Sequence, residues 1–115
     1  MTARRLIVVL STPTADAAAL ALRYAATAAA LDVPVELHVV SAGAVGVFSR
    51  RAVSGEMVAP LQQALEAGAE AFVCPAALAE QGLRAEELID GFAGIRGAAS
   101  LLAAGLAPGA RFLSF

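Results

Sequence analysis

Cys74 is the only cysteine in the chain and its best candidate for chemistry. It closes the apolar run Ala71–Cys74 and is followed by Pro75. Proline holds the residue before it in extended backbone and is favoured as a first helical residue, so Cys74 is predicted to end a strand and cap a helix. The free backbone N–H groups and the helix dipole there would favour the thiolate. The alternative is an inert cysteine, packed as a small hydrophobic residue.

Other polar residues are weaker site candidates. His38, the only histidine, lies near the end of a predicted strand and would act as a base or donor. The alternative is a structural histidine, or one at a subunit contact. Arg50 and Arg51 would attract an anionic substrate or partner, or form a solvated loop pair. Ser11 and Thr12, at a predicted helix start, would hold an anion or only cap the helix.

Metal and cofactor sites are not predicted. One histidine and one cysteine cannot build a Cys/His zinc site within one chain. Gly91, Gly94 and Gly97 lack the spacing of the dinucleotide-binding fingerprint, so they are interpreted as turn residues. A single cysteine excludes an internal disulfide and indicates a reducing, cytoplasmic location.

Composition narrows the function further. The chain has 115 residues, which predicts a single domain over residues 1–115. Its net charge of −2, with arginine as the only basic residue besides histidine, argues against a broad nucleic-acid interface. The apolar stretch Ala15–Leu31 is too short for a membrane span and is interrupted by Asp16 and Arg23. The 59% hydrophobic content, mostly alanine, indicates close packing and self-association.

Strands and helices alternate along the chain. The Ser41–Gly55 stretch, with three glycines, is predicted to be a long mobile loop. This alternation predicts a three-layer α/β/α sandwich around a mostly parallel sheet of about five strands. The predicted strands are Leu6–Leu10, Val35–Val40, Ala71–Cys74, Phe92–Ile95 and Arg111–Phe115. The predicted helices are one from the Thr12 cap to about Leu31, then Glu56–Ala67, Ala76–Gln81, a turn at Glu86–Ile89, and Ala98–Gly105.

The stretch Phe72 through Phe92 reads F-V-C-P-A-A-L-A-E-Q-G-L-R-A-E-E-L-I-D-G-F. It resembles the DsrE/DsrF-like family, in which a strand ends in Cys, a short helix follows, and a G-[LIV] step precedes L-I-x-G-[VF]. The resemblance implies a small cytosolic protein that forms a homotrimer or homohexamer. It also implies that Cys74 matches the residue that carries a persulfide in some members. The Ala-rich first helix and the pair Arg50-Arg51 depart from that pattern.

Three functions therefore remain open. The first is a sulfur carrier or sulfurtransferase, with Cys74 accepting sulfur from a donor protein and passing it to an acceptor. The second is a non-catalytic binding or assembly protein with a structural Cys74. The third is a small-molecule binder that uses the crevice at the strand ends. Exposure of Cys74 in a pocket would favour the first function, and sealing of Cys74 in apolar packing would favour the second.

Overall fold

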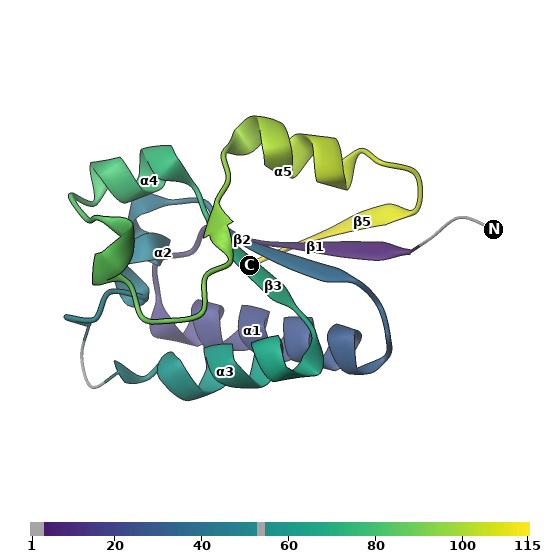
Figure 1. Ribbon diagram of the computed structural model, residues 1–115, viewed down its shortest axis with the longest axis horizontal. Helices are drawn as coiled ribbons and strands as arrows, with labels where there is room; N and C mark the ends of the chain where they lie inside the picture. The colour runs from purple at the N-terminus through teal and green to yellow at the C-terminus, as the bar shows by residue number, and fades with distance from the viewer. Residues whose placement is uncertain (1–3, 53–54) are drawn as a thin grey trace.

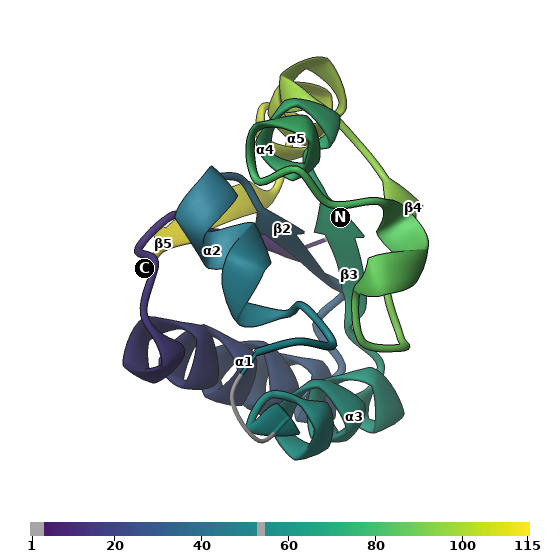
Figure 2. The ribbon, with the colours of Figure 1, turned by 90° about the vertical axis from the view of Figure 1, so that its left-hand side faces the viewer.

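One sheet of five parallel strands, in the order β4-β3-β2-β1-β5, organises the computed structural model, which describes residues 4–52 and 55–115. Figures 1 and 2 show α1 and α3 on one face of the sheet and α4 and α5 on the other. This arrangement is the predicted three-layer α/β/α sandwich. The strands are β1 (Arg5–Leu10), β2 (Val35–Val39), β3 (Glu70–Val73), β4 (Gly94–Ile95) and β5 (Ala110–Ser114). The helices are α1 (Ala15–Ala30), α2 (Ala42–Val47), α3 (Val58–Ala67), α4 (Pro75–Glu80) and α5 (Ala98–Gly105), with a 3-10 turn at Ala85–Glu87.

The central strand β2 is buried along its whole length. Its Val35, Leu37 and Val39 belong to the apolar core that also includes the small residues of α1. Because strand side chains alternate, Glu36 and His38 point to the opposite face of the sheet. The middle of the sheet therefore carries an apolar face and a face with two polar side chains.

The residues between Ser41 and Phe48 correct the sequence-based prediction of a long mobile loop. They form α2, whose N-terminus is capped by the Ser41 hydroxyl, 3.1 Å from the backbone N of Ala44. The glycines of this segment allow other parts of the chain to pack closely against its backbone. A Cβ at Gly43 would come within 2.4 Å of the Pro13 Cβ, and one at Gly46 within 3.0 Å of the Gln81 side chain. Residues 53 and 54 of the predicted loop lie outside the described residues.

The first helix begins later than predicted. Its N-cap is Thr14, not Thr12, and the Thr14 hydroxyl accepts a hydrogen bond from the backbone N of Ala17 at 3.1 Å. The backbone N–H groups of Ser11 and Thr12 instead donate to the carbonyl oxygen of Phe115, at 2.9 and 3.2 Å. These bonds tie the segment after β1 to the end of the chain, and the extended backbone of the N-cap falls at Thr14 (φ −125°, ψ 151°).

The fourth strand is shorter than predicted, because it covers only Gly94–Ile95. Phe92 packs edge-on against Phe48 of the α2 segment, with ring centroids 5.4 Å apart. The Phe92 side chain thus packs beside α2, while the backbone N of Ala93 still donates to the carbonyl of Ala71 on β3 at 2.8 Å. Among the described residues, no helix is both long and apolar enough to cross a membrane.

Candidate functional site

Cys74 lies where β3 ends and α4 begins, as the sequence predicts. It is the N-cap of α4, with extended backbone (φ −69°, ψ 126°), and Pro75 is the first helical residue. Its backbone N donates to the carbonyl of Val39 at 3.0 Å, which ties the end of β3 to the end of β2. The side chain makes no capping hydrogen bond and is half-buried. The sulfur is therefore neither sealed in the core nor engaged by the helix it precedes.

A cavity of about 160 Å³ adjoins Cys74 at the carboxyl ends of β2 and β3. The start of α5 forms its other wall. Open parallel sheets place ligands at this edge. The lining residues are His38, Val40, Cys74, Arg96, Gly97, Ala98 and Leu101. The structure thus brings His38 and Cys74, both predicted from the sequence, to one cavity.

His38 is held by a neighbour on its own strand. Only 1% of the residue is exposed, and its Nε2 lies 3.0 Å from Oε1 of Glu36. Glu36 is itself buried, at 8% exposure. In the neutral ring, a carboxylate beside Nε2 selects the tautomer that carries its proton on that nitrogen. Nδ1 is then the ring nitrogen that can accept a proton.

Two arginines neutralise Glu36 from either side. Nη1 of Arg5, on β1, lies 3.3 Å from Oε2, and Nη1 of Arg96 lies 3.7 Å from Oε1. Two guanidinium groups against one carboxylate leave a net positive charge when His38 is neutral. A buried carboxylate costs several kcal/mol unless it is paired in this way.

Arg96 links this charged cluster to the cavity. It follows β4, and its backbone N donates to the carbonyl of Val73 at 3.0 Å. The guanidinium carbon lies 4.0 Å from the centre of the Phe72 ring, a cation–π contact. The backbone bond positions Arg96, and the cation–π contact orients its side chain, which lines the same cavity as Cys74.

Ser11 and Thr12 do not line this cavity. Their backbone N–H groups already donate to Phe115, and the Ser11 hydroxyl lies 3.4 Å from the same carbonyl oxygen. The carbonyl of Ser11 accepts from the Ser41 hydroxyl at 2.6 Å. An anion site at Ser11 and Thr12 remains a prediction, and these internal bonds already engage both backbone N–H groups and the Ser11 hydroxyl.

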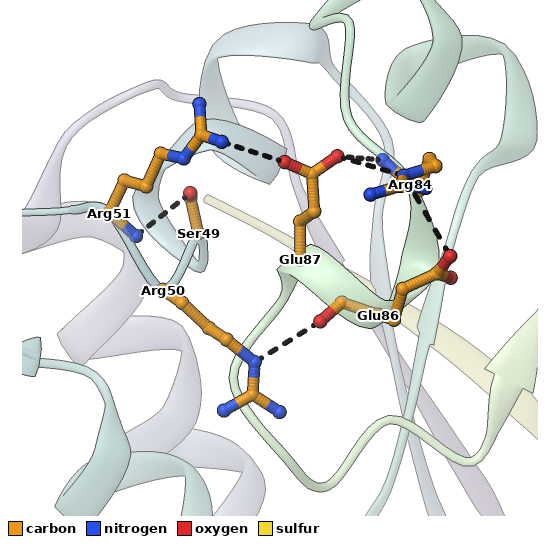
Figure 3. A network of polar contacts seen from close by, with 6 residues as sticks. All are labelled: Ser49, Arg50, Arg51, Arg84, Glu86 and Glu87. Atoms are coloured by element: carbon orange, nitrogen blue, oxygen red, sulfur yellow. Dashed lines mark hydrogen bonds and ion pairs between the residues drawn. The ribbon is translucent and has the colours of Figure 1, made fainter.

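Arg50 and Arg51 also lie away from Cys74, in a polar cluster drawn in Figure 3. Arg50 contacts the carboxylate of Asp90 at 2.6 Å and the backbone carbonyl of Glu86 at 3.1 Å. Arg51 pairs with Glu87 at 3.5 Å. These contacts join the segment after α2 to the segment around the 3-10 turn. They give both arginines partners within the chain, and a binding role for Arg50 and Arg51 stays a prediction.

Glu87 is the centre of that polar cluster. A hydrogen bond from the backbone N of Arg84 holds the pKa of its carboxyl below the usual value, and the Arg84 and Arg51 guanidinium groups act in the same direction. Partial burial opposes this shift but does not cancel it. Glu87 is therefore ionised wherever the protein is near neutral pH.

Glu36 and Arg96 were not among the residues predicted from the sequence to form a site. The alternation of β2 does place Glu36 on the same face as His38, which was a usable signal. The sequence contains no comparable signal for Arg96, because its place at the cavity depends on the pairing of β4 with β3. No group of three or more histidine, cysteine, aspartate or glutamate side chains that could hold a metal ion occurs within residues 4–52 and 55–115.

Comparison with known proteins places this arrangement in a family. A search of curated proteins gave no match. The fold is similar to that of the ychN protein from E. coli, with a TM-score of 0.77 and 19% identity over 97% of this chain and 99% of that one. It is also similar to MTH1491 from Methanobacterium thermoautotrophicum, a protein of unknown function, with a TM-score of 0.78 and 14% identity over 97% of this chain and 99% of that one. The DsrE/DsrF-like family matches residues 4–115. The chain therefore belongs to the DsrE/DsrF-like family.

Proposed function

We propose that this protein is a cytoplasmic sulfur carrier that accepts and passes on sulfur as a persulfide on Cys74. The supporting observation is the half-buried Cys74 thiol, which has no hydrogen bond to its helix and lines a cavity with His38 and Arg96. Family membership supports the same chemistry, because the resemblance matches Cys74 to the cysteine that carries sulfur in some members.

The chemistry is an exchange of sulfur between thiols. The Cys74 thiolate attacks the outer sulfur of a donor persulfide, R–S–SH. A new S–S bond forms to Cys74, the donor S–S bond breaks, and its electron pair leaves on the donor as a thiolate. The proton stays on the transferred sulfur or is released to solvent. An acceptor thiolate then attacks that outer sulfur and regenerates the Cys74 thiolate, so no external oxidant or reductant is needed.

His38 has a role in this proposal as the proton acceptor for the Cys74 thiol. Its Nε2 is engaged by Glu36, which leaves Nδ1 as the basic nitrogen of the neutral ring. The ring lines the same cavity as the sulfur. Glu36 is a positioning residue in this scheme, because it fixes the orientation and tautomer of His38 without lining the cavity itself.

Intact-protein mass spectrometry tests the proposal. The protein is incubated with a low-molecular-weight persulfide and then freed of small molecules. We expect one added sulfur atom on the wild type, none on Cys74→Ser, and loss of the sulfur after addition of an acceptor thiol. A folded wild type that stays unmodified, or a Cys74→Ser protein that gains the same mass, would contradict the proposal.

The non-catalytic alternative, assembly, is favoured by one specific observation. Large apolar side chains are exposed on α5 and the neighbouring edge strand: Leu102 at 50%, Leu106 at 76% and Phe112 at 43%. Such a patch is typical of an interface between subunits. We propose that it contacts a second copy of the chain in a homotrimer or homohexamer, and light scattering that finds only monomers at micromolar concentrations would refute this.

A further inference from the structure

The cavity beside Cys74 carries a charge bias that persulfide exchange itself does not require. Among the described residues that line it, Arg96 alone has a permanent charge and none carries a carboxylate. Glu36, the nearest acidic partner, faces Arg5, His38 and Arg96 together, and its contact with Arg96 is the longest of the three at 3.7 Å. A guanidinium has five N–H donors, so one long ion pair leaves most of the Arg96 donors available.

The start of α5 adds backbone donors that also suit an anion. Gly97, the N-cap of α5, makes no side-chain hydrogen bond to the helix. The first backbone N–H groups of this eight-residue helix therefore have no side-chain cap where the helix begins, beside the cavity. Nδ1 of the neutral His38 ring is an acceptor and adds no donor for an anion, so the donors at this wall are the Arg96 guanidinium and the first N–H groups of α5.

We infer that the cavity formed by Cys74, Arg96 and the start of α5 is a binding site for small anions, so that the co-substrates of Cys74 are small anions and not neutral compounds. The Phe72 ring under the guanidinium and the Arg96 backbone bond to Val73 hold the charge in place before a ligand arrives. The volume of about 160 Å³ equals that of about five water molecules. This admits an anion of a few heavy atoms.

The inference rests on the proposed function only where it names the anion as a co-substrate, and binding can be tested separately. Iodoacetate and iodoacetamide alkylate the same thiol and are nearly equal in size, but only iodoacetate is charged. The ratio of their second-order rates at Cys74, measured at low ionic strength, reports the charge preference of the cavity.

We expect this ratio to be about fivefold higher in the wild type than in Arg96→Gln, as for one unit charge a few ångströms away in a solvated site. Arg96→Lys keeps the charge without the planar stack and should keep most of the preference. The matched control is Arg23→Gln, on the exposed face of α1, which should behave as the wild type. Equal ratios in the wild type and in Arg96→Gln would overturn the inference.

A second measurement uses inorganic sulfate as an unreactive probe. Sulfate, added at constant ionic strength against chloride, should slow alkylation of Cys74 by neutral iodoacetamide in the wild type and not in Arg96→Gln. Equal slowing in both proteins would contradict a site at Arg96. If the charge preference is present but no sulfur loads onto Cys74, the anion site stands and the persulfide proposal fails. If sulfur loads onto Cys74 but there is no charge preference, the persulfide proposal stands and the anion site fails.

Discussion

Nε2 of His38 lies 3.0 Å from Oε1 of Glu36, and both residues belong to the buried central strand β2. Few sequences place two ionisable side chains in the middle of a parallel sheet, because burial of charge is costly. Here the cost is offset by Arg5 and Arg96, which reach Glu36 from β1 and from the end of β4. The cluster connects the interior of the sheet to the cavity at Cys74.

Replacement of Glu36 by glutamine should therefore affect both stability and reactivity. The change leaves two half-exposed arginines beside a neutral amide, and because their charges stay hydrated we expect a loss of about 1 kcal/mol. It also replaces the charged acceptor of the His38 Nε2 hydrogen bond by a neutral amide, which holds that tautomer less firmly, so alkylation of Cys74 at neutral pH should slow. Urea unfolding and iodoacetamide rates measure the two effects.

Glu70→Gln is the matched control for Glu36→Gln, because Glu70 pairs with Glu36 in the sheet register but is exposed. It should leave both stability and alkylation near the wild-type values. If Glu36→Gln is as stable as Glu70→Gln and Cys74 reacts as fast, the charged cluster has neither role.

Gly105→Ala should destabilise the contact between α5 and β5. A Cβ at Gly105 would overlap the Phe112 ring. Overpacking of this kind costs about 1–3 kcal/mol unless the ring moves. Thermal unfolding of the variant should show a lower midpoint, and the double variant Gly105→Ala/Phe112→Ala should recover part of the loss attributed to the clash. A single variant with an unchanged midpoint would show that Phe112 is free to move.

The contact between the segment after α2 and the 3-10 turn should weaken in acid. The pKa of the Glu87 carboxyl is lower in the folded chain than in an unfolded one, first because of the Arg84 backbone hydrogen bond. Its contribution is therefore complete above the unfolded value of about 4.3 and is lost as the pH falls through the folded value. Urea unfolding between about pH 6 and pH 3 should show a smaller acid-dependent loss in Glu87→Gln than in the wild type.

Glu66→Gln provides the comparison for Glu87→Gln. Glu66 is exposed on α3 and makes no ion pair with the residues that the structure describes. Its replacement should leave the acid dependence of unfolding unchanged. Identical pH profiles for Glu87→Gln and the wild type would refute a role for Glu87 in this contact.

Much of the fold was predictable, because it depends on local signals. The apolar run before Ser11, the β-branched residues of β2 and the Cys74-Pro75 step each indicate their element from neighbouring residues alone. The α2 helix was missed because Gly43 and Gly46 are usually signs of a loop. Their actual role, close packing against Pro13 and Gln81, requires contacts that are distant in sequence.

The candidate site, like the fold, was predictable only where local sequence signals were sufficient. Cys74 and His38 were predicted because strand ends meet at one edge of a parallel sheet. Arg96 was not, because its position depends on a two-residue strand and on the Phe72 ring beneath it. Arg50 was predicted as a binding residue, and the carboxylate that the structure places beside it, Asp90, is forty positions away.

The rate of Cys74 alkylation in the folded protein tests the central claim most directly, since a sulfur carrier needs an accessible thiol. The native wild type is given a short pulse of iodoacetamide at neutral pH, and the same pulse is applied in urea as the reference for a fully exposed thiol. We predict that native Cys74 reacts at least as fast as the unfolded thiol, with Cys74→Ser unlabelled in both conditions. A native thiol that reacts only after unfolding would contradict the account and favour the structural, assembly-only alternative.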